Sequence, residues 1–379
     1  MLAPMAGISN WPFRLLVQRF QPNVLAISEM INARAIVERN PKTNRLMEFH
    51  PEEQFRAVQL FSNNAADLKS AVEIIGRENR ADHIDLNFGC PVPKVTRKGG
   101  GAAIPLKPEL LREMLFAVKT GSADFGITMS AKFRIGIDDQ HQTYLRACQI
   151  ANEVGVDFIT LHARTAEQYY GGEADWSVFN SALGETNLPV FLNGDIFSPA
   201  DAVALLEQVE PQYYERAGLA CARGALGRPW LFKELSRMPN LFEGIRKETR
   251  NQAQATRPAT TVSASGIPKV PESYSEIRPV MLEHLQLLME YYRDETMACK
   301  DFRKHTIYYL KGFNIGAEYR RQLALLDNYQ QLEQLLSQLE QLLSQLEDQR
   351  PELQTVGTLK RGKTKGSRKV HLPYGWLSS

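Results

Sequence analysis

The pattern of apolar and polar positions in the first part of the chain alternates between two periods. Short apolar segments end in Gly, Asn or a charged residue, as strands do, and between them apolar residues recur at the spacing of amphipathic helices. The predicted helices include 66–77, 108–119, 143–154 and 199–208, and the eight predicted strands are 2–5, 24–27, 57–61, 83–87, 128–133, 158–162, 190–193 and 219–222. Eight βα units predict an α/β chain folded as a TIM (β/α)8 barrel over residues 1–240. A doubly wound sheet is the alternative, but no Gly-x-Gly-x-x-Gly follows the first strand.

Beyond the predicted barrel the composition changes twice. Residues 241–276 are rich in Ala, Thr, Ser, Gln and Pro, which is typical of a flexible linker. Residues 277–349 have helical periodicity and predict a smaller, all-helical C-terminal domain; leucines at 332, 335, 339, 342 and 346 form a heptad seam too short for independent association. Residues 350–379 are basic and predict a disordered tail.

Composition narrows the class of protein. The 379 residues are 43% apolar, yet no stretch is long and apolar enough to span a membrane and no signal peptide opens the chain, so we expect a cytoplasmic protein. The four cysteines are too far apart for paired metal ligands, so we expect reduced thiols, no metal and no membrane partner, and a monomer. A net charge of +2 requires any nucleic-acid surface to be local.

Cys90 follows an alternating strand and opens a loop rich in Gly, Pro and basic residues. Lys94, Arg97 and Lys98 precede the run 99–101 of three glycines. A free cysteine is often a buried structural residue. A Gly-Cys-Pro corner beside glycines is better suited to close approach by a flat or anionic ligand.

Polar residues at the predicted strand ends add to this site, because TIM-barrel active sites lie where strands run into βα loops. Taken singly, Asn193 could cap a helix, His162 could be a satisfied core group and Lys132 could form a surface ion pair. Their convergence on one face favours a shared pocket. The residues at these ends are Pro4, Met5, Ala6, Gln59, Cys90, Lys132, His162, Asn193 and Arg223.

The loops after the last two strands predict a phosphate site. Gly194 and Asp195 follow one strand, Ala222 and Arg223 follow the next, and a helix is predicted at 227–233. Small residues let backbone N–H groups reach phosphate oxygens, and an arginine adds a charged fork. A lysine at 132 does not identify the phosphorylated ligand.

Several of these segments occur together in one known family. The chain resembles the tRNA-dihydrouridine synthases, and more closely their bacterial B-type subgroup. The resemblance runs from 2–7 to 227–230 and resumes at 302–305 and 310–313. The shared motifs are 58–60, 87–91, 132–136, 161–165, 193–195 and 223–230.

The resemblance implies that the phosphate belongs to FMN. Pro4, Met5 and Ala6 would then border the isoalloxazine, Gln59 would bond a ring edge, Lys132 would lie near N1 and O2, and His162 would orient the ring or phosphate. The family usually has Gly where this chain has Ala222, and Ala does not readily adopt positive φ.

The implied reaction reduces specific tRNA uridines to 5,6-dihydrouridine, with NADPH as the implied electron donor. Hydride would pass from flavin N5 to uracil C6, and Cys90, as a thiol, would give the proton to C5. Asn87, Arg134 and Arg164 are candidates for holding the uracil edge. Which uridine is reduced stays open.

The helical domain would bind tRNA in this family. Lys300, Arg303, Lys304 and Lys311 recur at helical spacing and could face an RNA backbone, although a solvated helix face is the plain alternative. Two other functions stay open: another FMN barrel oxidoreductase, such as a dihydroorotate dehydrogenase-like enzyme, or a non-catalytic RNA-binding or scaffold protein.

Overall fold

A parallel sheet of seven strands in sequential order, β1 to β7, forms the centre of the computed structural model, which describes residues 1–238, 268–344 and 368–377. Every neighbouring pair is parallel, as βα crossovers require. The strands are β1 (Ile27–Asn32), β2 (Ala57–Phe61), β3 (His83–Phe88), β4 (Thr128–Arg134), β5 (Phe158–His162), β6 (Val190–Asn193) and β7 (Ala217–Ala220).

The start of the chain closes this sheet into a barrel. Leu2 forms parallel bridges with Ala26, next to β1, and with Cys221, next to β7. The N–H of Leu2 donates to the Leu25 carbonyl, and the N–H of Ala3 donates to the Cys221 carbonyl, both at 2.8 Å. The predicted TIM barrel is therefore confirmed. The first strand of the barrel is reduced to these bridges. Pro4, which follows Ala3, has no N–H to extend the hydrogen-bond ladder.

Two strands are displaced from their predicted positions. β1 begins at Ile27 rather than residue 24, and β7 covers Ala217–Ala220 rather than 219–222. Polar Ser28 and Glu29 interrupt the apolar pattern of β1, and the register shifts between Ile27 and Met30 as in a β-bulge. As a consequence, Glu29 lies on a barrel strand instead of in a loop.

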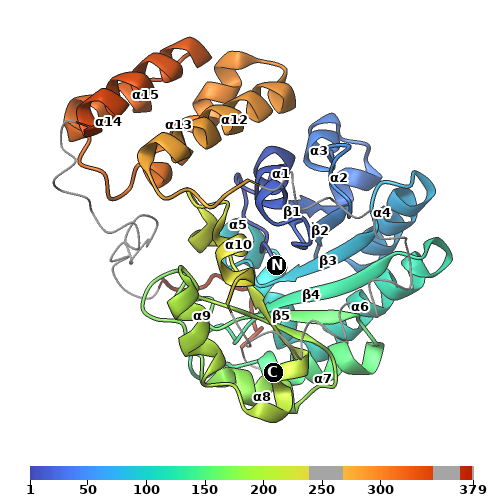
Figure 1. Cartoon of the computed structure of the whole chain (residues 1–379). Helices are drawn as coiled ribbons and strands as arrows, with labels where there is room; N and C mark the ends of the chain where they lie inside the picture. The colour runs from blue at the N-terminus through green and yellow to red at the C-terminus, as the bar shows by residue number, and fades with distance from the viewer. Residues whose placement is uncertain (239–267, 345–367, 378–379) are drawn as a thin grey trace.

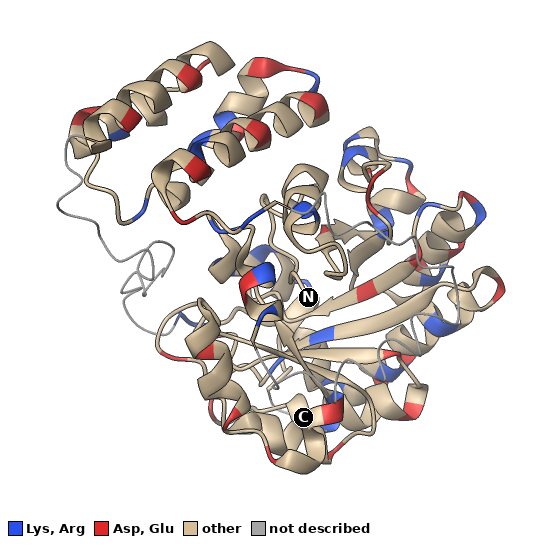
Figure 2. Cartoon of the chain, viewed as in Figure 1, with Lys and Arg blue, Asp and Glu red and all other residues tan. Residues whose placement is uncertain are grey.

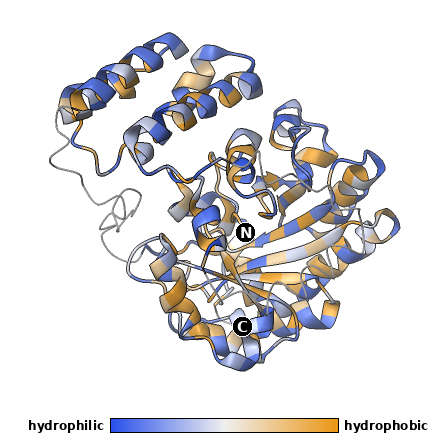
Figure 3. Cartoon of the chain, viewed as in Figure 1, coloured by the Kyte–Doolittle hydropathy of each residue, from blue (hydrophilic) through white to orange (hydrophobic). Residues whose placement is uncertain are grey.

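Helices surround the barrel (Figure 1). Charged residues of both signs are spread over them (Figure 2), whereas the strands carry both hydrophilic and hydrophobic residues (Figure 3). The helices of this part are α1 (Trp11–Phe20), α2 (Ala33–Val37), α3 (Pro41–Leu46), α4 (Ala65–Arg77), α5 (Pro93–Thr96), α6 (Pro108–Ser122), α7 (Tyr144–Val154), α8 (Val178–Gly184), α9 (Pro199–Leu206) and α10 (Leu231–Ser236), with short 3-10 helices η1 (Gly101–Leu106), η2 (Ala123–Phe125), η3 (Pro211–Arg216) and η4 (Arg223–Ala225).

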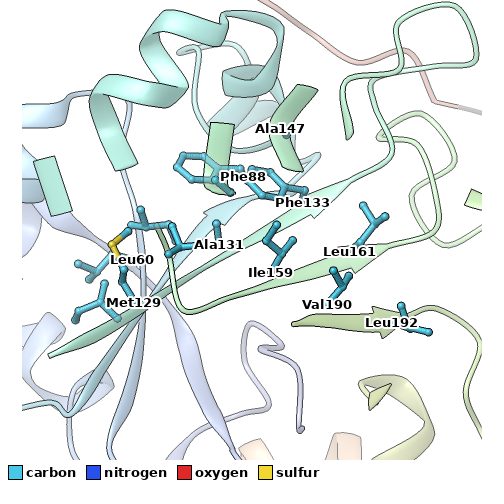
Figure 4. Packing of buried hydrophobic residues seen from close by; sticks show 14 of the residues in the cluster. Leu60, Phe88, Met129, Ala131, Phe133, Ala147, Ile159, Leu161, Val190 and Leu192 are labelled. Atoms are coloured by element: carbon cyan, nitrogen blue, oxygen red, sulfur yellow. The ribbon is translucent and has the colours of Figure 1, made fainter. Parts of the chain in front are cut away.

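Alternation along the strands separates two kinds of side chain. Leu60, Leu86, Ala131 and Leu161 belong to one buried apolar cluster with the surrounding helices (Figure 4). Burying each such leucine stabilises the fold by roughly 1.5–3 kcal/mol. The intervening residues point to the other face, toward the barrel interior, and many of them are polar. The same alternation thus builds the core and lines the inside of the barrel.

The described residues of the C-terminal domain form four further helices: α12 (Tyr274–Tyr292), α13 (Glu295–Tyr309), α14 (Gly316–Ala324) and α15 (Tyr329–Ser344). The leucine seam of α15 packs within the chain, since Leu332, Leu335 and Leu339 are buried in one cluster with α12 residues. The Tyr274 hydroxyl donates to the Leu336 carbonyl at 2.9 Å. None of the helices in the described ranges has the length and apolarity to cross a membrane.

The predicted boundaries of the second part fall partly on undescribed residues. Most of the expected linker 241–276 and the last seam position, Leu346, lie outside the described residues. Within the described part, α12 already begins at Tyr274, with the Ser273 side chain accepting from the Glu276 N–H as its cap. The helical domain therefore begins slightly earlier than predicted.

The barrel and the helical domain share an apolar interface. Trp11, Leu15 and Phe20 of α1 belong to the same buried cluster as α12 and α13. Gly227 meets the end of α13 so closely that a Cβ there would lie 2.3 Å from the Tyr308 carbonyl carbon. The predicted helix at 227–233 begins instead at Leu231, and Gly227 has φ +68°, which is outside the range of a right-handed helix.

The expectation of a disordered tail is wrong for residues 368–377. Val370 is only 7% exposed and packs with Ala102, Ile137 and Ala166 of the barrel. Figure 1 shows the end of the chain at the barrel, apart from α15. The prediction rested on the basic residues of the tail. Residues 368–377 also include the apolar side chains Val370, Leu372 and Trp376, which can pack.

Candidate active site

The barrel interior is polar toward the carboxyl ends of β3 to β6. In register, Lys132 stands beside Asn87, and His162 stands between Arg134 and Asn193. Each pair is in phase, so these side chains share the inner face. The structure therefore brings together most of the polar residues predicted at the strand ends.

A buried carboxylate, Asp85, organises the β2 to β4 side and was missed by the sequence analysis. Gln59 and Ser130 donate to its two oxygens, each at 2.6 Å, and Asn87 donates to the Gln59 side-chain oxygen at 2.9 Å. Burial raises the pKa of Asp85, although these hydrogen bonds and the Lys132 charge oppose the shift. The available signal was that Asp85 precedes Asn87 by two residues and so shares its strand face.

Lys132 is half-buried between this network and β6. Its ammonium donates to the Asn193 side-chain oxygen at 3.1 Å, and the Asn193 amide donates to the Ala220 carbonyl at 2.7 Å. Burial, together with the nearby Arg134 charge, lowers the pKa of Lys132 to about 8. The amine is thus mostly a cation at neutral pH, and its charge is directed into the barrel mouth. Asn193 acts as an orienting group and not as a helix cap.

The predicted phosphate loops meet at Asp195. One carboxylate oxygen accepts from Arg164 at 2.6 Å, and the other accepts from Arg223 at 3.0 Å. Burial opposes ionisation of Asp195, but hydrogen bonds from Arg164 and Ala174 and the Arg223 charge lower its pKa below the ordinary value. The Arg164 side chain is fully buried, whereas that of Arg223 is 25% exposed. Arg223 is therefore the more accessible of the two to a ligand.

The backbone of these loops explains why alanine is accommodated at residue 222. Gly194 has φ +134° and Asp195 has φ +55°, so the left-handed positions lie in the first loop. Ala222 has φ −119° and needs no such freedom. The alanine is compatible with the loop.

The Cys90 loop is held from inside the barrel. The Asn87 side-chain oxygen accepts from the N–H groups of Gly89 at 3.2 Å and Cys90 at 2.9 Å. Arg134 donates to the Gly89 carbonyl at 2.8 Å. Asn87 and Arg134 thus fix the loop directly.

The sequence predicted that the glycine run leaves room for a ligand. In the structure, the run instead supports Cys90. Gly101 has φ +55°, and a Cβ there would lie 2.6 Å from the Cys90 carbonyl oxygen. The Ala102 N–H donates to that same oxygen at 3.0 Å. The close approach is between two parts of the same loop, so glycine is required by the chain itself.

Burial raises the pKa of the Cys90 thiol, although a backbone hydrogen bond from Val92 and the Arg134 charge oppose the shift. The group is therefore a thiol at neutral pH and can donate a proton. Burial and four neighbouring arginine and lysine charges lower the pKa of His162 well below its ordinary value, so the imidazole is neutral. The mouth holds fixed cations beside two neutral groups.

The loop after Leu2 connects the barrel mouth to the helical domain. Met5 is half-buried and Ala6 is exposed at the turn. The Gly7 N–H donates to the Glu29 carboxylate, and Lys304 of α13 donates to the Gly7 carbonyl. Burial raises the pKa of Glu29, a second residue that the sequence analysis missed because it was placed outside a strand.

The four cations predicted to face RNA do not form one free surface. Arg303 donates to the Leu326 carbonyl and pairs with Asp327 at 2.8 Å, and Lys304 also pairs with Asp301. Lys300 is exposed. Tyr170, which was not predicted, is 49% exposed and lies within cation–π range of Arg134 and Arg223.

Within the described ranges, no three His, Cys, Asp or Glu residues lie close enough together to hold a metal ion. The fold and the site define a TIM-barrel enzyme whose mouth joins buried cations to a protonated thiol. Residues 1–347 match the family model described as dihydrouridine synthase (Dus). The chain belongs to this family and is an oxidoreductase that forms dihydrouridine, which decides against the alternative functions.

Similar proteins carry consistent names. The "Probable tRNA-dihydrouridine synthase" of Mycobacterium tuberculosis is 36% identical over 100% of this chain and 89% of its own length. That of Mycobacterium leprae is also 36% identical, over 100% and 95%. "tRNA-dihydrouridine synthase B" of Vibrio vulnificus is 30% identical over 86% and 90%. The predicted family is confirmed, and B-type proteins are among its relatives.

The raised pKa of Cys90 predicts how the thiol reacts. Alkylation by iodoacetamide should rise about tenfold per pH unit above pH 7, because only the thiolate reacts. Mass spectrometry of the Cys90 peptide measures the rates. A wild-type rate that is already constant at pH 7 would contradict the protonated thiol.

Proposed function

We propose that the protein is an FMN-dependent tRNA-dihydrouridine synthase in which Cys90 is the general acid. The observation that carries the proposal is the protonated thiol on a loop fixed by Asn87 and Arg134 at the carboxyl end of β3. An acid must hold its proton until the carbanion forms. A buried thiol at neutral pH meets that requirement.

The mouth fits the phosphate of FMN. Arg223 is partly exposed beside the backbone of Gly194 and Ala222. The Nη1 atom of Arg164 is buried and has no hydrogen-bond partner among the described residues. Buried donors without acceptors favour an anionic ligand. Arg223 and the backbone N–H groups of Gly194, Asp195 and Ala222 would hold the phosphate.

The inner residues fit the remainder of the cofactor. Gln59, Lys132 and His162 line the polar face, and Pro4, Met5 and Ala6 border it from the first loop. FMN, when bound and reduced, supplies the hydride. Lys132, as a cation, stabilises negative charge in the mouth, and neutral His162 can accept or donate one hydrogen bond without adding charge.

Cys90 then gives its proton to C5 of the uracil. Asn87 and Arg134 hold the loop and remain our candidates for the base edge. Arg164, proposed from sequence as a base contact, has a fully buried side chain that bonds the Gly171 and Gly172 carbonyls. We therefore assign it to loop structure and the phosphate end.

The helical domain supports tRNA as the substrate. α13 contacts the mouth through Lys304 at Gly7 and Tyr308 at Gly227, so RNA bound to it would lie over the barrel opening. We propose Lys300 and Lys311 as phosphate contacts and assign Arg303 and Lys304 mainly to structure. NADPH as donor, a cytoplasmic location and a monomeric state complete the proposal.

Replacing Cys90 with Ala separates the half-reactions. NADPH oxidation and bound FMN should stay near wild type, whereas uridine reduction should slow by about 10²–10⁴-fold, because one positioned acid is lost. Stopped-flow absorbance and dihydrouridine assays measure the two steps. Cys90→Ser, which keeps a weaker acid, should retain more activity than Cys90→Ala. Equal loss of both half-reactions would contradict the assigned role.

The cofactor assignment is tested at Arg223. Denatured protein should release FMN, and Arg223→Ala should bind it roughly 10- to 100-fold more weakly, because a charge-assisted hydrogen bond is lost. Fluorescence titration gives the affinity. Arg321→Ala is the matched control, because that exposed arginine pairs with Glu318 on α14, away from the phosphate loops. If neither released nor added FMN is detected, the assignment fails.

The RNA assignment is tested at Lys300. Lys300→Ala should reduce the log–log salt slope of tRNA binding by about 0.7–0.9, the value of one phosphate contact. Arg303→Ala should mainly lower stability, since it breaks contacts to Leu326 and Asp327. Filter binding across a salt series decides. A slope that matches wild type would remove Lys300 from the RNA surface.

A further inference from the structure

The last described segment of the chain, residues 368–377, lies on the loop that carries Cys90. The Trp376 ring covers Gly99, where a Cβ would lie 2.8 Å from the ring. The Lys107 ammonium lies 5.8 Å from the centre of the same ring. Gly99 has φ +73° and begins the turn that ends at Gly101, beneath Cys90. Trp376 therefore covers the outer side of this turn.

The other end of the segment holds the opposite flank of Cys90. The Arg368 N–H donates to the Glu167 carbonyl at 2.9 Å, and its guanidinium lies 5.5 Å from the Tyr169 ring centre. The Tyr169 hydroxyl donates to the carbonyl of Pro91, the residue after Cys90, at 2.8 Å. Arg368 is thus one residue removed from the loop through Tyr169.

The middle of the segment packs on the support beneath Cys90. Val370 is buried with Ala102, Ile137 and Ala166. The N–H of Ala102 is the donor to the Cys90 carbonyl. The segment therefore contacts the Cys90 loop or its supports at three points, through Arg368, Val370 and Trp376.

The loop needs such support on its outer side. Its helix, α5, has only four residues and no side-chain cap. Loops with few buried contacts open locally at low free energy. Asn87 and Arg134 restrain the loop only from inside the barrel.

We propose that residues 368–377, the C-terminal brace, are a positioning element that holds the Cys90 loop closed against the barrel for proton transfer. The catalytic part of this inference rests on the proposed function of Cys90. The brace lies beyond residue 347, where the match to the family ends. The mycobacterial relatives nevertheless align with all of this chain, so their alignment covers the brace.

The test compares the full chain with a variant truncated after residue 367 and with Trp376→Ala. The matched control is Tyr374→Ala, because the Tyr374 side chain lies in the same segment and is fully exposed. Cys90 should be alkylated by iodoacetamide about 3- to 10-fold faster in both brace variants, and trypsin should cut faster at Lys94, Arg97 or Lys98, because the loop opens more often. Tyr374→Ala should match wild type.

Two further readouts separate positioning from damage. Buried Cys148, Cys221 and Cys299 should stay unreactive, which shows that the variants remain folded. The kcat for uridine reduction should fall by a similar factor, with KM for tRNA and bound FMN unchanged.

Alkylation and cleavage at wild-type rates in both variants would contradict the proposed role of the brace. A raised kcat with a lowered KM would also contradict it, because the segment would then obstruct the substrate site. Alkylation and cleavage do not depend on turnover. They therefore test the brace even if the Cys90→Ala experiment removes the thiol from the mechanism.

Discussion

The barrel mouth depends on pairing charges that are buried there. Asp195 accepts from fully buried Arg164 and from Arg223, and the loss of one partner from such a buried pair costs about 3–5 kcal/mol. Because Asp195 occupies a left-handed position after Gly194, the carboxylate reaches both arginines only while this loop keeps its shape. The phosphate loops and the loop after β5 are therefore one structural unit, and a ligand at Arg223 meets a preformed site.

The same requirement shapes the Cys90 side. Asp85 satisfies Gln59 and Ser130, Gln59 satisfies Asn87, and Asn87 holds the Cys90 backbone. Each hydrogen bond fixes the next side chain, so the position of the thiol is linked to a buried carboxylate on β3, the strand that leads into the Cys90 loop. Burial also keeps the thiol protonated. The hydrogen bonds therefore set the position of the Cys90 loop, and burial at the same place keeps the thiol protonated.

The helical domain is attached at the mouth, where it can influence the chemistry. α13 leaves no room for a side chain at Gly227 and binds the Gly7 turn through Lys304. The apolar residues of α1 complete the contact. RNA held by this domain would have a defined orientation relative to Cys90, because Lys304 and Tyr308 of α13 both contact loops of the barrel mouth.

The sequence by itself determined the barrel, the strand-end positions of Lys132, His162 and Asn193, and the place of Cys90 just after a strand, because strand and helix periods and the end of each strand are local properties. It misplaced β1, since polar Ser28 and Glu29 interrupt the apolar pattern of the strand and resemble a loop. Only the tertiary structure decided that Arg303 and Lys304 bond the protein, that the glycines support Cys90, and that residues 368–377 pack on its loop. The physical reason is that a sequence pattern shows which side chains can be covered or paired, whereas their partners come from segments distant along the chain.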